Sequence, residues 1–292
     1  MTAINPIITV RELQERIATR PDSVLVCDCR SDLVDYDLGQ RVYAQGHIPG
    51  ARFVNMSTEL SGPKSGHNGR HPLPDKAVFV ATLAQWGVND DTLVVGYDSH
   101  GGMYASRLWW LVLRAGHARV AVLDGGLPAW EAAGFPVSPD LPQARIAGNI
   151  RQGSPLVTEV ALANVRAGLG NPGRLIVDAR PPDRFQGQNE TLDPRAGHMP
   201  GAVNRPSRNN VTDAGFFKDA ATLRAEYDQL LGAYKPQQMV ASCGSGVSAC
   251  HMLLAMRIAG LPGGALYGGS WSEWSAQPDT PVELGPSPAQ PH

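Results

Sequence analysis

The chain has 292 residues, and its 25 Lys and Arg against 27 Asp and Glu give a formal net charge of −2. At roughly 100–200 residues per domain, this length predicts two domains. A hydrophobic content of 42% with 18% charged residues excludes an intrinsically disordered chain. The slightly negative charge argues against a nucleic-acid partner, because such partners normally select a basic surface.

Membrane insertion and a disulfide scaffold are also disfavoured. The longest apolar run, Leu108–Leu113, is much shorter than the ~20 residues that span a bilayer. Met1–Val10 lacks the basic flank and the apolar stretch of a signal peptide. Four cysteines in a chain of this length are too few for a disulfide framework. We therefore expect a cytoplasmic protein with free thiols and no membrane contact.

Short apolar runs alternate with helical segments along the first half of the chain. Thr9-Val10-Arg11-Glu12 has the pattern of a capping box and predicts that a helix begins there. The next predicted elements, in chain order, are a strand at Val24–Cys27, a helix at Pro74–Trp86, a strand at Thr92–Tyr97, a helix at Met103–Ala115 and a strand at Arg119–Leu123. Short β-branched strands between helices are typical of a parallel sheet with helices on both faces.

The second half of the chain repeats the first. Matching segments occur in the same order: Val26–Arg30 with Ile176–Arg180, Gly46–Ala51 with Gly197–Ala202, Val94–Asp98 with Met239–Cys243, and Asp124–Trp130 with Gly268–Trp274. Strands are predicted in the second copy at Leu175–Asp178, Gln238–Ser242 and Ala265–Tyr267. A repeat of this length predicts duplicated domains rather than a solenoid. The expected fold class is α/β, with two tandem domains that are each a parallel sheet flanked by helices.

Composition places the domain boundaries. We expect a first domain at residues 1–138, a linker rich in Pro and Gly at 139–155, a second domain at 156–283 and a flexible tail at 284–292. Two further pairs recur in both copies, namely His47 with His198 and Arg30 with Arg180. Because each pair also occurs in the first copy, where Asp98 stands at the position of Cys243, we interpret these pairs as structural.

One reactive side chain is predicted at a strand end: Cys243, in Cys243-Gly244-Ser245-Gly246-Val247-Ser248-Ala249, with a helix expected at roughly Ser248–Ala259. The two glycines allow the backbone to curl so that successive amides face one centre, and the helix N-terminus adds partial positive charge. Such a setting favours the thiolate form of a cysteine. The loop therefore predicts an anion cradle around a sulfur nucleophile.

Three other interpretations of this loop remain open. Gly244-x-Gly246-x-x-Ala249 formally matches a dinucleotide fingerprint, but Leu261–Ser270 offers no acidic residue for the ribose. A cysteine phosphatase requires Cys-x5-Arg, and Ala249 stands where the arginine is needed. The third interpretation is a buried structural cysteine, against which the flanking glycines and hydroxyls argue.

The duplicated pattern, the two Gly-His-x-Pro-Gly-Ala turns and the Cys-Gly-Ser-Gly-Val-Ser-Ala loop resemble the tandem rhodanese-type sulfurtransferases over roughly residues 5–283. Within that family the loop is similar to that of the mercaptopyruvate-specific members, which reads Cys-Gly-Ser-Gly-Val-Thr-Ala. Thiosulfate-specific members typically carry Arg-Lys after the cysteine. The resemblance implies two rhodanese-like domains, the first of them non-catalytic because Asp98 stands in place of the nucleophile.

The resemblance also implies the catalytic residues. Cys243 would be the nucleophile, and Ser245 would act with His71, although Ser57 stands approximately where the family has an aspartate. His67 and His71 have the spacing of helical metal ligands, but their Gly- and Pro-rich surroundings exclude a helix, so no metal is expected.

The same resemblance implies how substrate is held. Arg184 and Arg195 match positions that bind the substrate carboxylate and carbonyl, a task that suits the planar fork of arginine. The segment between them is longer than expected for the family. The remaining binding residues lie in the cysteine loop: Gly244, Gly246, Val247 and Ser248.

The implied reaction transfers sulfane sulfur from 3-mercaptopyruvate, through a Cys243 persulfide, to a thiol or cyanide acceptor, with release of pyruvate. The expected partners are a small-molecule sulfur donor and an acceptor thiol such as a thioredoxin-like protein, and no cofactor is expected. The alternatives are a thiosulfate:cyanide sulfurtransferase and a non-catalytic rhodanese-like binding module.

Overall fold

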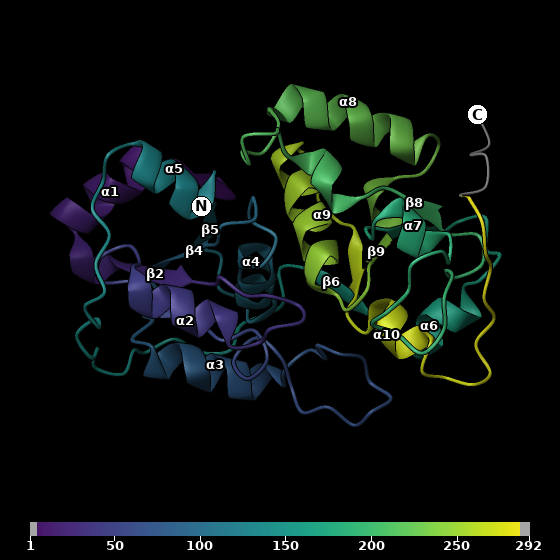
Figure 1. The fold of residues 1–292 in the computed structure, drawn as a ribbon, viewed down its shortest axis with the longest axis horizontal. Coiled ribbons are helices and arrows are strands. Elements are labelled where there is room, and N and C mark those ends of the chain that lie inside the picture. The colour runs from purple at the N-terminus through teal and green to yellow at the C-terminus, as the bar shows by residue number, and fades with distance from the viewer. Residues whose placement is uncertain (1–4, 287–292) are drawn as a thin grey trace. The chain divides into compact units, whose positions relative to one another are not determined.

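The computed structural model describes residues 5–286, which form two compact units, each built on a five-stranded parallel sheet with helices packed around it (Figure 1). The predicted fold class is thereby confirmed. Most of the predicted flexible tail, residues 287–292, lies outside the described residues. No helix among residues 5–286 combines the length and the apolar character needed to cross a bilayer.

The first unit contains the first copy of the repeat. Its strands are β1 (Ile7–Ile8), β2 (Val24–Asp28), β3 (Arg52–Phe53), β4 (Leu93–Tyr97) and β5 (Val120–Leu123). Its helices are α1 (Val10–Thr19), α2 (Leu38–Gln45), α3 (Lys76–Gln85), α4 (Ala105–Arg114) and α5 (Gly126–Ala132). The sheet has the order β1-β5-β4-β2-β3, and the capping box predicted at Thr9 and Glu12 is present at the start of α1.

The second unit contains the second copy. Its strands are β6 (Thr158–Val160), β7 (Leu175–Asp178), β8 (Val203–Asn204), β9 (Met239–Ser242) and β10 (Ala265–Tyr267). Its helices are α6 (Leu162–Ala167), α7 (Pro182–Phe185), α8 (Ala220–Leu231), α9 (Val247–Ile258) and α10 (Ser270–Trp274). The order β6-β10-β9-β7-β8 repeats that of the first sheet strand for strand, so the repeat seen in the sequence is a repeat of topology.

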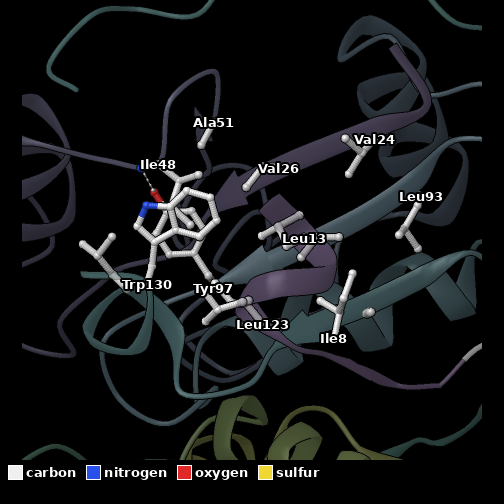
Figure 2. Close-up of a cluster of buried hydrophobic side chains, with 14 residues drawn as sticks. Ile8, Leu13, Val24, Val26, Ile48, Ala51, Leu93, Tyr97, Leu123 and Trp130 are labelled. Atoms are coloured by element: carbon white, nitrogen blue, oxygen red, sulfur yellow. Dashed lines mark hydrogen bonds between the residues drawn. The ribbon is translucent and has the colours of Figure 1, made fainter. Parts of the chain in front are cut away.

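Both faces of the central strands are covered. Every residue of β2, β4 and β9 is buried, as expected for parallel strands between two helical layers. Figure 2 shows the cluster on one face of the first sheet, where Leu13 of α1 and Trp130 of α5 pack with Val26 and Tyr97. Burial of these side chains holds the carboxyl ends of the strands in place.

The repeated polar pairs are structural in both copies. Arg30 donates to the carboxylate of Asp28 and to the carbonyl of Gly46, and Arg180 bonds Asp178 and the second Gly-His turn in the same way. Each pair ties a strand end to the turn that follows it. The prediction for Arg30 and Arg180 is confirmed.

The repeated histidines also act alike. The ring of His47 stacks on Tyr43 with the ring centres 3.8 Å apart, and the ring of His198 stacks on Phe185 at the same separation. In each case Nδ1 lies 2.9 Å from the backbone carbonyl of its aromatic partner. Both histidines therefore stabilise turns, as predicted.

The units differ from the predicted domains in two exchanged segments. Pro63–Leu73, from the first half of the chain, belongs to the second unit, and Thr212–Phe217 belongs to the first. The expected linker also lies in the first unit, where the amides of Gly148, Ile150 and Gly153 donate to its backbone carbonyls. The proline and glycine content of the linker indicates irregular structure but carries no signal for the unit against which it packs.

A carboxylate fills the strand-end loop of the first unit. Asp98 follows β4 directly and is fully buried. Its two carboxylate oxygens accept hydrogen bonds of 2.7–2.9 Å from the backbone amides of His100, Gly102, Tyr104 and Ala105. The loop is thus an anion cradle whose anion is part of the chain.

We expect Asp98→Ala to lower the free energy of unfolding by about 3 kcal/mol or more, because each buried amide left without an acceptor costs ~1–3 kcal/mol. Asp98→Asn is the matched control, since its amide oxygen still accepts while its NH2 group faces two of the donors. Urea denaturation should rank the three proteins with Asn between wild type and Ala. Equal stability of all three would show that the loop does not depend on this carboxylate.

Candidate functional site

The second unit places a thiol where the first places Asp98. Cys243 follows β9 directly, at the carboxyl end of the parallel sheet, where ligands of such sheets bind. Its side chain is buried, and the amide of Gly246 donates to Sγ at 3.1 Å. Gly246 has φ +79° and precedes the first turn of α9, so the partial positive charge of this helix N-terminus lies beside the sulfur.

Ser270 anchors the other side of the cysteine. The amide of Cys243 donates to Ser270 Oγ at 3.0 Å, and that hydroxyl lies 2.9 Å from the carbonyl of Tyr267 and 3.9 Å from Cys243 Sγ. Ser270 has φ +52°, in the left-handed region, which is unfavourable for a residue with a side chain. The matching position of the first copy is Gly126, with φ +59°.

Sequence reasoning missed Ser270, although a signal was present. Ser270 lies four residues before Trp274, and Gly126 lies four residues before the matching Trp130, so the two positions correspond. A glycine in one copy indicates a backbone position that needs left-handed φ, and a serine kept there in the other copy indicates that its hydroxyl is required.

His71 and Ser245 meet as the resemblance implied. Nδ1 of His71 lies 2.9 Å from Ser245 Oγ, and both side chains are buried. His71 reaches this place because Pro63–Leu73 belongs to the second unit, where the amide of Arg70 donates to Ser272 Oγ at 3.0 Å. The pair thus brings an imidazole within hydrogen-bonding distance of a hydroxyl that lies two residues from Cys243 along the chain.

Two arginines lie against the cysteine loop. A Cβ atom placed on Gly244 would be 3.0 Å from Nη2 of Arg70 and 3.5 Å from Nη1 of Arg184. The absence of a side chain at Gly244 thus allows both guanidinium groups to approach the backbone beside Cys243. Arg184 was predicted here, whereas Arg70 was not, since no charge pattern distinguishes it from a solvated loop arginine.

Buried carboxylates hold the opposite edges of these two arginines. Glu190 binds Nε and Nη2 of Arg184 at 2.7–3.2 Å, and Asp193 bonds Nη2 of Arg184 at 3.1 Å and Nη1 of Arg70. The side chains of both acids are 1% exposed. Burial raises the pKa of Asp193, and the contact with Arg70 opposes that change.

Arg195 has a different set of partners from the one predicted. Its guanidinium donates to the backbone carbonyls of Trp274, Ser275, Gln277 and Thr280, at 2.6–3.0 Å. These carbonyls lie at and beyond the C-terminal end of α10, where an arginine satisfies acceptors that the helix leaves open. The structure therefore gives Arg195 a capping role and places Arg70 beside Arg184 at the cysteine loop.

The other predicted residues lie on or near the same loop. Val247 and Ser248 form the first positions of α9, and the thiol of Cys250, one turn further on, donates to the carbonyl of Gly246. Trp271 and Trp274 are fully buried in the core of the second unit. Within residues 5–286 no cluster of three or more His, Cys, Asp or Glu has an arrangement that would hold a metal ion.

Comparison with known proteins places the chain in a family. A model described as "Rhodanese-like domain" matches residues 9–133 and 161–277. The probable 3-mercaptopyruvate sulfurtransferase of Pseudomonas aeruginosa is 42% identical over 282 residues, which cover 96% of this chain and 98% of the relative. The thiosulfate sulfurtransferase of Gallus gallus is 37% identical over 238 residues, covering 80% and 79%. The solved structure of SseA from Escherichia coli, a 3-mercaptopyruvate sulfotransferase, matches with a TM-score of 0.78 at 29% identity, covering 92% of this chain and 100% of that chain.

The strained serine gives a stability prediction. Ser270→Ala is expected to lower the free energy of unfolding by about 1–3 kcal/mol, because the buried amide of Cys243 loses its acceptor. Ser270→Gly removes the same hydroxyl but adopts left-handed φ freely, so a smaller loss is expected. Urea denaturation measures both variants, and equal losses would show that the backbone at residue 270 stores no strain.

Proposed function

The chain belongs to the rhodanese family and is a sulfurtransferase, and on that basis we propose that it transfers sulfur from 3-mercaptopyruvate, through a Cys243 persulfide, to a thiol acceptor. The observation that carries this proposal is the pair of guanidinium groups that lie against the backbone of Gly244, beside the buried thiol. A donor that carries a carboxylate and a carbonyl next to its sulfur matches such a pair. The neutral Gly244-Ser245-Gly246 segment adds no side-chain cation of its own.

The first half-reaction breaks a carbon–sulfur bond. The Cys243 thiolate attacks the thiol sulfur of 3-mercaptopyruvate, and a sulfur–sulfur bond forms as the carbon–sulfur bond breaks. The electron pair of the broken bond passes to the three-carbon fragment as an enolate, and the proton of the donor thiol ends on its methyl carbon. Pyruvate leaves, and Cys243 carries an anionic persulfide.

Each charge in this step has a partner among the described residues. Arg184 and Arg70 would hold the carboxylate and the enolate oxygen, because arginine forms paired bonds to such groups. The amide of Gly246 and the N-terminus of α9 would stabilise the sulfur anion. Ser245 and His71, 2.9 Å apart, would carry the proton from sulfur to carbon.

The second half-reaction regenerates the thiolate. An acceptor thiolate attacks the outer sulfur of the persulfide, the sulfur–sulfur bond to Cys243 breaks, and the acceptor leaves as a persulfide. The same chemistry serves a small thiol, a reduced thioredoxin-like protein or cyanide, which leaves as thiocyanate.

Thiosulfate is the competing donor, because relatives that act on it are of similar identity to this chain. It carries two negative charges, and the arginines near Cys243 are already paired with Glu190 and Asp193. Moving a dianion out of water into such a site costs more than moving a monoanion. We therefore place 3-mercaptopyruvate ahead of thiosulfate.

Donor preference and persulfide formation test this proposal together. Incubation with 3-mercaptopyruvate should add the mass of one sulfur atom to Cys243 and release pyruvate, and kcat/KM should be higher for 3-mercaptopyruvate than for thiosulfate. Cys243→Ser should gain no sulfur, whereas Cys250→Ser, the matched control, should gain it as wild type does. A preference for thiosulfate would overturn the donor assignment. If neither donor added mass to Cys243, the result would contradict the persulfide mechanism and favour the alternative of a non-catalytic binding module.

Arginine variants test how the donor is held. Arg184→Gln and Arg70→Gln should each lower kcat/KM for 3-mercaptopyruvate at least ~10-fold, since lost charge-assisted bonds cost about 1.5–3 kcal/mol. Arg224→Gln is the control, because Arg224 pairs with Asp228 in an exposed contact on α8. Steady-state pyruvate release measures all three, and an unchanged value for Arg184→Gln would remove Arg184 from the substrate site.

A further inference from the structure

The arginines beside Cys243 belong to a charge cluster that is neutral in itself. Salt bridges join three guanidinium groups to three carboxylates: Arg70, Arg180 and Arg184 with Asp178, Glu190 and Asp193. The side chains of all three acids are at most 1% exposed. Because these formal charges cancel, the cluster offers an incoming donor directed N–H groups rather than a net positive charge.

The acids determine which edge of each arginine faces the cysteine. Glu190 binds Nε and Nη2 of Arg184, and the Arg184 nitrogen nearest to Gly244 is Nη1, followed by Nη2. Asp193 binds Nη1 of Arg70, whereas Nη2 of Arg70 lies towards Gly244. In both guanidinium groups the nitrogen nearest to Gly244 thus differs from the nitrogens that bind Glu190 and Asp193.

The loop that carries the acids is itself fixed by one of them. Glu190 Oε1 accepts hydrogen bonds from the amides of Leu192 and Asp193, at 2.9 Å and 3.1 Å. This arrangement sets the position of the Asp193 carboxylate, and with it the contact to Arg70. Arg180 is bound on its other side by Asp178 and lies over the ring of Trp271, so it anchors the cluster to the core.

We propose that Glu190 and Asp193 are positioning residues that aim Arg184 and Arg70 at the donor and, by cancelling their charge, set specificity for a singly charged donor over a doubly charged one. This inference rests on the proposed function of the site. A monoanion such as 3-mercaptopyruvate accepts hydrogen bonds from the N–H groups of Arg184 and Arg70, and it does not need an excess positive charge in the site. A dianion such as thiosulfate would need an uncompensated cation to offset its loss of hydration.

The test separates the charge of Glu190 from its reach. Glu190→Gln keeps the size and removes the charge, so the ratio of kcat/KM for thiosulfate to that for 3-mercaptopyruvate should rise about 10-fold, through a lower KM for thiosulfate, because one unpaired charge acts over a few ångströms. Glu190→Asp keeps the charge and shortens the side chain, so KM should rise for both donors while the ratio stays near that of wild type. Asp193→Asn should change the ratio in the same direction as Glu190→Gln.

Glu226→Gln is the matched control, since it removes the same charge from a pair with Arg205 and Lys218 elsewhere in the second unit. Its ratio should equal that of wild type. Folding of Glu190→Gln and Asp193→Asn is checked by circular dichroism. If both variants fold and lower kcat/KM for both donors by the same factor, the specificity role is overturned. A Glu190→Asp variant with wild-type KM values would overturn the positioning role.

Failure of this inference can be distinguished from failure of the proposed function. Wild-type preference for thiosulfate would overturn the donor assignment, whereas the change in ratio between wild type and Glu190→Gln is measured whichever donor is preferred. A persulfide on Cys243 of each variant, detected by mass, shows that the sulfur chemistry is intact while specificity is being read.

Discussion

Both units depend on a strand-end loop in which backbone amides donate to one buried side chain, through four amides in the first unit and the amide of Gly246 in the second. In the first unit the anion is the Asp98 carboxylate, and four amides bind it. In the second unit the same position is occupied by Cys243. Its sulfur accepts a hydrogen bond from the amide of Gly246 and lies at the N-terminus of α9. The two copies therefore use one electrostatic device, which is permanently filled in the first and available for a reacting sulfur in the second.

Asp98 satisfies the backbone amides of the strand-end loop in the first unit without a cysteine. A carboxylate cannot carry a persulfide, but it satisfies the buried amides that would otherwise be orphaned. Gly126 and Ser270 occupy matching positions at the neighbouring turn and differ in the same way, because the second unit has a polar side chain there. Both have left-handed φ, yet Ser270 bears the strain of a side chain because its hydroxyl accepts a hydrogen bond from the amide of Cys243.

Sequence patterns predicted the fold class and the central strands of both sheets, whereas the edge strands β1, β3, β6 and β8 were not predicted. The strands at Leu175–Asp178 and Ala265–Tyr267 were predicted to the residue, and those that end at Tyr97 and Ser242 differ by one residue at the start. Alternating apolar runs and glycine turns carry this information locally. The membership of Pro63–Leu73 could not be predicted, because contacts between segments far apart in the chain leave no local pattern.

The site was predictable where chemistry follows sequence order and not where it follows packing. Cys243 and its glycines are contiguous, so their spacing alone indicates an anion cradle. Arg195 illustrates the limit, since sequence position cannot distinguish an arginine that meets substrate from one that caps backbone carbonyls. Arg70 illustrates the converse, because it gains its place beside Gly244 through the fold alone.

The exchanged segment Pro63–Leu73 makes the candidate site depend on both copies of the repeat. Arg70 and His71 come from the first half of the sequence but belong to the unit that holds Cys243. The segment is anchored there by the bond from the Arg70 amide to Ser272, and its ends continue into α3 and the rest of the first unit. The second copy alone would keep the sulfur cradle, Arg184 and the two buried acids. It would lack the imidazole next to Ser245 and one of the two guanidinium groups beside Gly244. The first half of the sequence therefore supplies residues of the candidate site, and this dependence gives a physical reason for both halves to be retained in one chain.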